Sequence, residues 1–252
     1  MQKEVGWLLK EKYHNKATKN FYNDMKRLEA GEPLDYVVGF TEFLGCKIDL
    51  SKRPLIPRPE TEFWAEKAIE EIKKNKQKNI KCLDIFSGSG CIGIAVLKNL
   101  LPARRSLGEG GCDFADVDKK ALRQIKINCR INNINKKRYK IIQSDIFSNI
   151  KGKYNYIFTN PPYISLKNKN KIQKSVLKYE PKQALFGGKD GLFYIRRFLK
   201  EAKNHLNRGG RIYMEFDSSQ KKAIEKLFKK FRCSNFKFHE DQYGKWRYVV
   251  IK

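Results

Sequence analysis

Apolar residues recur along the chain at the spacings of short helices and strands. Within residues 1–31 they recur every three or four positions, which predicts one or two short helices that stop at Gly31 and Pro33. Residues 36–50 alternate apolar and polar side chains around internal glycines, which predicts a β-hairpin. Prolines within 54–59 then keep the chain extended, and a helix begins at Thr61.

From residue 80 onward, short apolar strands alternate with helical segments. We expect helices at about 92–101, 118–131, 192–206 and 218–231, and strands at 81–86, 112–116, 139–143, 154–159, 211–216, 236–240 and 246–252. Such alternation is typical of parallel strands joined by crossover helices. The pattern therefore predicts an α/β fold with a doubly wound, mainly parallel seven-stranded sheet of Rossmann-like type, in which the last strand is antiparallel.

This pattern divides the chain into three parts. Residues 1–32 form a short helical segment, 33–60 a β-hairpin with a proline-rich linker, and 61–252 the main α/β domain. One stretch, 101–111 (LPARRSLGEGG), suits neither helix nor strand and uses Arg where the rest of the chain prefers Lys. We expect an exposed loop there, with an artefact of the gene model as the alternative.

Composition excludes several classes of protein. With 40% hydrophobic residues the chain can bury a core, so a disordered or fibrous protein is excluded. No stretch approaches the roughly 18 apolar residues of a membrane span. The first residues also lack the apolar region of a secretory signal, which favours the cytoplasm. Six scattered cysteines without a CxxC pair, and three distant histidines, argue against a metal site or a disulfide framework.

The charge is strongly basic. There are 54 Lys and Arg residues against 27 Asp and Glu residues, so the formal net charge is +27. An excess of this size raises the affinity for polyanions such as nucleic acids or ribosomes. The alternative is a generally lysine-rich surface without such a role, because the lysines are spread evenly along the chain.

Residues 83–93 (LDIFSGSGCIG) place a glycine-rich turn between a predicted strand and a predicted helix. Gly88 and Gly90 allow a ligand to approach the backbone closely, and the first amides of the helix are unpaired donors. Asp84, near the end of the strand, is an acceptor for a cationic or hydroxyl-bearing ligand. A tight connection without a ligand is the alternative, because such a turn alone is weak evidence.

Two further aspartates stand at the ends of the next strands. Asp116 ends the second strand, where doubly wound folds place an acid that binds a ribose diol. Asp145 ends the third strand and is suited to accept from an adenine amine, with Ile146 and Phe147 against the ring. Each aspartate alone is also explained by helix or turn capping. Together with the glycine turn they predict an adenosyl pocket at the carboxyl edge of the sheet.

The most specific motif is TNPPYI (159–164), directly after a buried strand. Neither proline has an N–H group, so the turn presents carbonyl oxygens, and the Asn160 side chain adds a further acceptor. These acceptors suit a planar –NH2 group, over which Tyr163 can stack.

With this motif the chain resembles class I S-adenosylmethionine-dependent methyltransferases that act on planar amino groups. Four further segments narrow the resemblance: GEPLDYVVGFTEF (31–43), LIPRPETE (55–62), YEPKQALFGGKDGL (179–192) and DQYGKWRYVV (241–250). They look like the protein-glutamine N5-methyltransferases that modify peptide chain release factors. The resemblance covers about residue 31 to the end of the chain.

The resemblance implies an enzyme that transfers a methyl group from S-adenosylmethionine to a glutamine side-chain amide, with S-adenosylhomocysteine as product and no metal. It makes residues 61–252 the methyltransferase domain. The expected protein substrate is a release factor, at the glutamine of its Gly-Gly-Gln motif. Catalysis is expected of Asn160, Pro161 and Tyr163. Cofactor binding is expected of Asp84, Phe86, Ser87, Gly88, Ser89, Gly90, Asp116, Asp145, Ile146 and Asn160. Substrate binding is expected of Asn160, Pro161, Pro162, Tyr163, Arg58, Glu60, Glu180 and Pro181.

Two departures from the family pattern leave alternatives open. Phe86 stands where the family usually has Gly at the start of the glycine turn. The helical domain that docks the release factor is reduced here to about thirty residues. Glutamine methylation of a ribosomal protein, and N6-methylation of a flipped adenine in DNA or RNA, therefore stay as alternative functions. A non-catalytic RNA-binding or ribosome-binding protein is the third interpretation.

Overall fold

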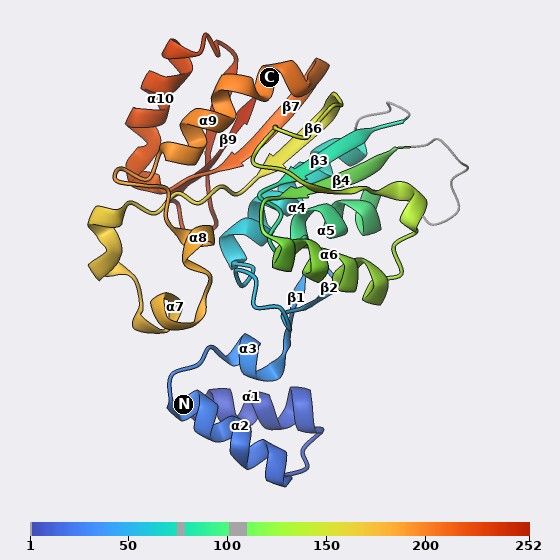
Figure 1. The fold of residues 1–252 in the computed structure, drawn as a ribbon, viewed down its shortest axis with the longest axis vertical. Coiled ribbons are helices and arrows are strands. Elements are labelled where there is room, and N and C mark those ends of the chain that lie inside the picture. The colour runs from blue at the N-terminus through green and yellow to red at the C-terminus, as the bar shows by residue number, and fades with distance from the viewer. Residues whose placement is uncertain (1, 75–78, 101–109) are drawn as a thin grey trace.

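A group of short elements forms the N-terminal end of the molecule. The computed structural model describes residues 2–74, 79–100 and 110–252. Its first elements are the helices α1 (Gln2–Tyr13), α2 (Lys19–Glu29) and α3 (Leu34–Val38) and the hairpin strands β1 (Phe40–Phe43) and β2 (Cys46–Asp49). The three helices lie at one end of the molecule, and the hairpin lies between them and the larger domain (Figure 1). The helices share a small core of Leu8, Phe21, Leu28 and Val37.

The hairpin begins later than the sequence pattern predicts. Residues 36–38 belong to α3, and the expectation of a strand from Tyr36 is therefore wrong. Pro33 precedes the helix, and Gly39 ends it with a left-handed backbone (φ 98°), its N–H donating to the Asp35 carbonyl. A glycine adopts this conformation without the steric cost of a side chain. Gly39 thus ends α3 directly before β1 begins.

The larger domain is a seven-stranded sheet in the order β5-β4-β3-β6-β7-β9-β8. Adjacent strands from β5 to β7 are parallel, and β9 is antiparallel to both β7 and β8. The predicted fold class is confirmed. The strands are β3 (Lys81–Ile85), β4 (Gly111–Asp116), β5 (Ile141–Gln143), β6 (Tyr154–Thr159), β7 (Leu206–Glu215), β8 (Phe236–Glu240) and β9 (Trp246–Ile251). The helices are α4 (Pro59–Lys74), α5 (Cys91–Leu100), α6 (Lys119–Ile131), α7 (Lys174–Tyr179), α8 (Lys182–Leu185), α9 (Phe193–Glu201) and α10 (Lys221–Lys230).

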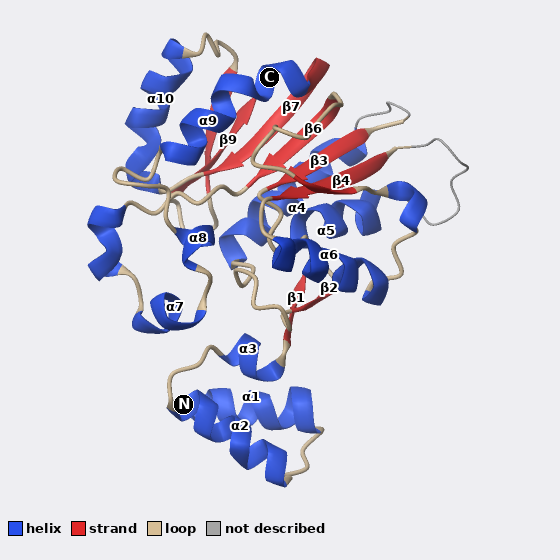
Figure 2. Cartoon of the chain, viewed as in Figure 1, coloured by secondary structure: helices blue, strands red, loops and turns tan. Residues whose placement is uncertain are grey.

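Helices cover both faces of the sheet, as Figure 2 shows. Alternate side chains of a strand point to opposite faces, so Cys82 packs with α4, α5 and α6, whereas the next residue, Leu83, packs with α9 and α10. Strand β6 is buried along its whole length, as expected of a central parallel strand. Two hydrophobic cores result, and the polar ends of the strands are left for the edges of the sheet.

Three side-chain amides spaced four residues apart, two on α6 and one on the residue that caps its C-terminus, attach the hairpin to this domain. Asn128 accepts from the Asp49 N–H at 2.8 Å and donates to the carbonyls of Asp49 and Ser89. Asn132 bonds both backbone groups of Lys47, and Gln124 accepts from the Lys52 N–H. A four-residue spacing places these amides on one face of the helix. They pair backbone groups of β2 and of the turn after it, and thereby place the start of the linker that follows.

The loop predicted at 101–111 lies almost entirely outside the described residues. Of the stretch 101–111, residues 101–109 lie outside them, and Gly111 begins β4. Strand β5 is shorter than predicted and β7 begins earlier, at Leu206. All six cysteines are free and buried. Within the described ranges, every helix is too short or too polar to cross a bilayer.

Candidate functional site

Four neighbouring strands, β4, β3, β6 and β7, have their carboxyl ends in register at one edge of the sheet. Ile85 pairs with Ala115 on one side and with Thr159 on the other, and Thr159 pairs with Met214. The residues that follow therefore meet at the same edge, where open α/β sheets bind ligands. A solvent-open cleft lies there, and the residues that line it include Arg53, Arg58, Thr61, Phe86, Ser87, Gly88, Ser89, Asp116, Asp145, Ile146, Asn160, Pro162, Pro181 and Tyr194.

The glycine-rich turn forms one wall of this cleft. Phe86 has a left-handed backbone (φ 58°), and Gly88 does too (φ 53°). The Ser87 hydroxyl donates to the Asp84 carbonyl at 2.6 Å and accepts from the Ala115 N–H at 3.0 Å, which ties the turn to β4. A Cβ atom at position 88 would meet no other atom within 4 Å, so this side of the Gly88 backbone faces open space.

Asp84 lies beneath the turn and does not line the cleft. Its carboxylate accepts from the Gly93 N–H at 2.9 Å, in the first turn of α5. Burial raises the pKa of Asp84 to about 8. Its second oxygen is buried and has no hydrogen-bond partner among the described residues. The structure thus places Asp84 as a support of the helix start, and whether it contacts a ligand stays a prediction.

Asp116 is brought to the wall of the cleft. One carboxylate oxygen accepts from the Gly88 N–H and the other from the Asp118 N–H, both at 2.9 Å. Burial raises the pKa of Asp116. The two backbone donors fix the plane of the carboxylate beside the glycine turn. Asp118 in turn caps α6 through the Lys120 N–H, as predicted.

Asp145 and Ile146 follow β5 on the far side of Asp116. The Asp145 carboxylate forms two hydrogen bonds with Arg197 of α9, at 2.8 and 3.1 Å, and this pair is about half exposed. Ile146 is buried and has a left-handed backbone (φ 55°), which is rare for a β-branched residue. Sequence analysis identified the two residues but not the arginine, which comes from a helix fifty-two residues away.

The Asn-Pro-Pro-Tyr turn separates two cavities. Pro161 and Tyr163 line a second cavity beside the cleft, together with Ile164 and residues of the segment 172–176. Asn160 lines both cavities, and so do Leu55, Arg58 and Ala184. A group in the cleft and a group in the second cavity can therefore both reach Asn160.

A buried carboxylate that sequence analysis missed lies under this turn. Glu215, at the end of β7, accepts from the Tyr163 hydroxyl at 2.9 Å, and from the Thr61 hydroxyl and the Trp64 indole N–H at 2.7 Å each. The Asn160 amide donates to the Thr61 hydroxyl at 3.3 Å. Burial raises the pKa of Glu215, while these hydrogen bonds and Arg247 oppose that shift.

Glu215 could have been predicted from the sequence. The rule that selected Asp116 and Asp145, an acid at the carboxyl end of a predicted strand, applies equally to the strand 211–216. Thr61 belongs to the LIPRPETE segment, in which only its neighbours were selected. Tyr163, expected to stack on a substrate, also anchors its hydroxyl on Glu215.

Of the four residues expected to shape the substrate pocket, Arg58 and Pro181 line a cavity, whereas Glu60 and Glu180 do not. Arg58 lines both cavities and forms an ion pair with buried Glu180, which also accepts from the Ile56 N–H. Pro181 lines the cleft. Glu60 lines neither cavity, whereas the adjacent Thr61 does. Glu180 therefore holds the linker against the segment before α8.

Comparison with solved structures defines the fold class. The chain is similar to the ribosomal protein L11 methylase of Lactobacillus delbrueckii subsp. bulgaricus, with a TM-score of 0.55 and 17% identity over 81% of this chain and 83% of that one. It is also similar to the human METTL16 catalytic domain in complex with an RNA hairpin, with a TM-score of 0.61 and 15% identity over 82% and 75% of the two chains. The family of the methyltransferase small domain matches residues 66–189. The sheet order and the cleft at its carboxyl edge are those of a class I methyltransferase.

Comparison with curated sequences is more specific. A release factor glutamine methyltransferase of Lactococcus lactis is 35% identical over 252 residues, which cover 99% of this chain and 88% of the relative. The corresponding protein of Streptococcus pneumoniae is 33% identical and is covered to 83%, and that of Borreliella burgdorferi is 34% identical and is covered to 81%. This chain belongs to the release factor glutamine methyltransferase family, a family of S-adenosylmethionine-dependent enzymes.

Proposed function

We propose that this protein methylates the side-chain amide nitrogen of a protein glutamine, and that its substrate is the Gly-Gly-Gln glutamine of peptide chain release factors. Membership of the family supports the reaction. The observation that carries the proposal is the position of Asn160, on the walls of both the cleft and the second cavity. Because a release factor acts on the ribosome, the proposal places the enzyme in the cytoplasm.

The cleft has the chemistry that S-adenosylmethionine requires. The cofactor's ribose hydroxyls and adenine amine are donors, and Asp116 and Asp145 supply acceptors on the same wall. Ile146 and Phe86 supply apolar surface for the adenosyl and methionine parts. The open backbone at Gly88 permits close approach. We therefore assign the cofactor to the cleft wall formed by Phe86, Ser87, Gly88, Ser89, Asp116, Asp145, Ile146 and Asn160, without a metal. Asp84 and Gly90, which were also expected to bind it, lie behind this wall. When bound, it supplies a methyl group on a positively charged sulfur.

The second cavity accepts the glutamine amide. An amide nitrogen is a poor nucleophile because its lone pair is conjugated with the carbonyl group. The Asn160 side-chain oxygen and the Pro161 carbonyl accept its two N–H bonds, orient the nitrogen and favour positive charge on it during transfer. Tyr163 lines this cavity, and Pro162 and Pro181 line the adjoining cleft. The Arg58–Glu180 pair supports the wall that the two cavities share. Orientation of this kind lowers the activation free energy of transfer by on the order of 7 kcal/mol.

The test is methyl transfer from labelled S-adenosylmethionine to a purified release factor. A parallel sample carries alanine in place of the Gly-Gly-Gln glutamine, and ribosomal proteins and an adenine-containing oligonucleotide are offered separately. We expect label on the wild-type factor and none on the alanine variant. The Asn160→Ala enzyme should lose transfer while it binds the cofactor within a few-fold of the wild type.

Each other outcome identifies an alternative. Label on a ribosomal protein alone would mean that the enzyme methylates a glutamine of that protein and not of a release factor. Label on the oligonucleotide alone indicates adenine N6-methylation. Absence of label on every substrate, together with failure to bind the cofactor, would favour a non-catalytic RNA-binding or ribosome-binding protein, for which the net charge of +27 provides affinity.

A further inference from the structure

Glu215 receives three hydrogen bonds and makes none. Its two oxygens accept hydrogen bonds from the Thr61 and Tyr163 hydroxyls and from the Trp64 indole N–H, over distances of 2.7 to 2.9 Å. Its relative exposure is 1%. The donors come from α4 and from the turn after β6, segments 52 to 154 residues away in sequence. Three donors, two from α4 and one from the turn after β6, thus converge on one carboxyl group.

We propose that Glu215 is a positioning residue that sets which way the Asn160 amide faces. The inference rests on the proposed function, because it concerns the residue assigned to the glutamine amide. The Trp64 indole N–H can only donate, so the Glu215 Oε2 atom is an acceptor, and the Thr61 hydroxyl donates to this same oxygen. Thr61 can therefore meet Asn160 only as an acceptor.

The direction of this chain of hydrogen bonds decides the chemistry at Asn160. Because the Thr61 hydroxyl oxygen accepts a hydrogen bond from Asn160, the Asn160 NH2 group must face Thr61. The structure has this orientation, with 3.3 Å between the amide nitrogen and the hydroxyl oxygen. The amide oxygen then faces the opposite way, as the acceptor that a substrate –NH2 group needs. With the amide reversed, Asn160 would present two donors to a substrate nitrogen that also carries donors. Transfer requires the first orientation.

Glu215 acts in the same way on the other half of the motif. Its second oxygen holds the Tyr163 hydroxyl, three residues after Asn160. The Gln220 amide donates to the Tyr163 carbonyl at 2.8 Å and fixes the backbone of the turn. One buried carboxyl group therefore controls both polar side chains of the turn that line the second cavity, Asn160 and Tyr163, although Glu215 lines neither cavity.

Burial of a carboxylate costs free energy, so a carboxylate is a poor choice for a residue whose only role is to stabilise the fold. A well-packed apolar residue of similar volume is often as stable as a buried charged group. The carboxylate offers what an apolar residue lacks, a fixed hydrogen-bond direction. Glu215→Gln keeps the volume but adds two N–H donors, so the direction of the hydrogen bonds is no longer imposed.

The experiment measures kcat and KM for methyl transfer to the release factor in four variants. Glu215→Gln and Thr61→Val should lower kcat by about 10²-fold, the cost of a small misplacement of a reacting group. The KM for the cofactor should stay near the wild-type value. Thr61→Ser retains the hydroxyl and should restore transfer to within about threefold of the wild type.

The matched control is Thr159→Val, directly before Asn160. The Thr159 hydroxyl is buried and has no hydrogen-bond partner among the described residues, so its removal leaves the chain of bonds intact. We expect transfer within about twofold of the wild type. Should Glu215→Gln fail to fold, the comparison of Thr61→Val with Thr61→Ser carries the same test.

A second readout does not depend on activity. The side-chain amide protons of Asn160 should show nuclear Overhauser contacts to the Thr61 methyl group in the wild type, and these should weaken in Glu215→Gln. Wild-type turnover in Glu215→Gln or Thr61→Val, or unchanged contacts, would overturn the inference. Absence of transfer by the wild-type enzyme, with the contacts present, would instead contradict the proposed function and leave the orientation supported.

Discussion

At the scale of single residues, the wall of the cleft contains backbone conformations that side chains disfavour. Phe86 and Ile146 both have a left-handed backbone, and both line the cleft. Each costs about 1–2 kcal/mol relative to the right-handed region. Such strain persists where surrounding structure imposes it, and it is concentrated at functional sites. Packing of the Phe86 ring against Tyr194, with centroids 5.8 Å apart, is one such constraint.

Two glycines near this wall should respond differently to the same substitution. Gly88→Ala places a methyl group in open space at a left-handed position, so it should cost about 1 kcal/mol of stability. The methyl group would also occupy the cleft, and cofactor affinity should fall at least about tenfold. Calorimetric titration with S-adenosylmethionine and urea unfolding measure the two effects.

Gly93→Ala is the matched comparison in the helix that follows. Its Cβ would lie 2.4 Å from the Phe114 ring, so either this buried ring or the helix must shift. Overpacking of this kind costs about 1–3 kcal/mol. We expect a larger loss of stability than in Gly88→Ala. Unchanged cofactor affinity in Gly88→Ala would show that Gly88 does not contact the cofactor.

At the scale of elements, the hairpin is attached by side chains instead of by strand pairing. Strands β1 and β2 form a sheet of their own, separate from the seven-stranded sheet. The amides of α6 satisfy the backbone of β2 and of Lys52. The linker that leaves β2 then forms part of the cleft wall through residues 52–58. Helix α6 therefore helps to shape the site without contributing a catalytic group.

Asn128→Leu should test this attachment. The apolar side chain leaves the Asp49 N–H and the Ser89 carbonyl without partners in a buried place. Each such group costs about 1–3 kcal/mol, so the free energy of unfolding should fall by at least about 2 kcal/mol. Urea unfolding should show a lower midpoint. Lys126→Ala, on the exposed face of the same helix, should change stability by less than about 0.5 kcal/mol.

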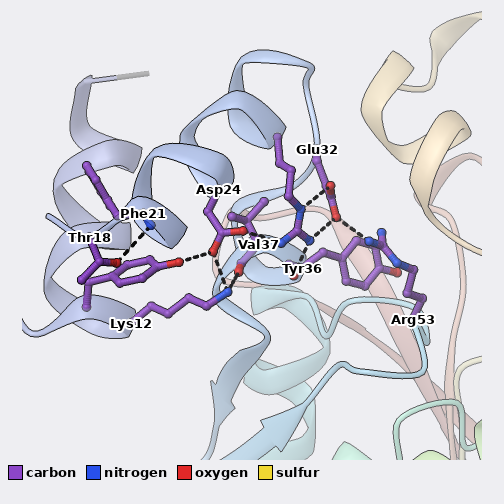
Figure 3. A network of polar contacts seen from close by, with 10 residues as sticks. Lys12, Thr18, Phe21, Asp24, Glu32, Tyr36, Val37 and Arg53 are labelled. Atoms are coloured by element: carbon purple, nitrogen blue, oxygen red, sulfur yellow. Dashed lines mark hydrogen bonds and ion pairs between the residues drawn. The ribbon is translucent and has the colours of Figure 1, made fainter.

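At the scale of the whole molecule, a polar network connects the N-terminal helices to the cleft (Figure 3). Glu32 accepts hydrogen bonds from Arg27 of α2, at 2.7 and 3.0 Å, and from Arg53, which lines the cleft, at 2.6 Å. Arg27 also bonds Asp24, which Lys12 and Tyr13 contact from α1. The Tyr36 hydroxyl donates to the Pro54 carbonyl at 2.6 Å. The proposed boundary at residue 32 is thus crossed by polar contacts.

Glu32→Gln should weaken this connection in a pH-dependent manner. Hydrogen bonds from Arg27 lower the pKa of Glu32, against the opposing effect of burial. A lowered pKa contributes stability that is present above the unfolded value of about 4.3 and is lost as the pH falls through the folded value. The difference in unfolding free energy between wild type and variant should therefore be largest near neutral pH and disappear at acid pH.

Urea unfolding between pH 3 and pH 7, followed by circular dichroism, measures that difference. Glu29→Gln is a suitable control, because Glu29 is the last residue of α2, three residues before Glu32, and is exposed. Its stability difference from wild type should be small at every pH. An effect of Glu32→Gln that does not vary with pH would mean that packing, and not the charge, holds the N-terminal helices to the domain.

Much of the fold was available from the pattern of apolar residues. The alternation from residue 80 onward predicted the parallel sheet, its antiparallel end and the helix starts near Thr61 and Asp118, since buried strands and helix caps have local signatures. The error at residues 36–38 has an equally local cause. Tyr36, Val37 and Val38 read as a strand, but packing of Val37 against Leu8, Phe21 and Leu28 decides for a helix.

For the site, the sequence alone determined the residues with local signatures: the glycine turn, the acids at strand ends and the Asn-Pro-Pro-Tyr turn. Only the tertiary structure decided how they are held. Arg197 reaches Asp145, Arg53 reaches Glu32, and Thr61, Tyr163 and Glu215 meet beneath Asn160. The physical reason is that a hydrogen bond depends on distance and direction in space, whereas a sequence motif records only separation along the chain.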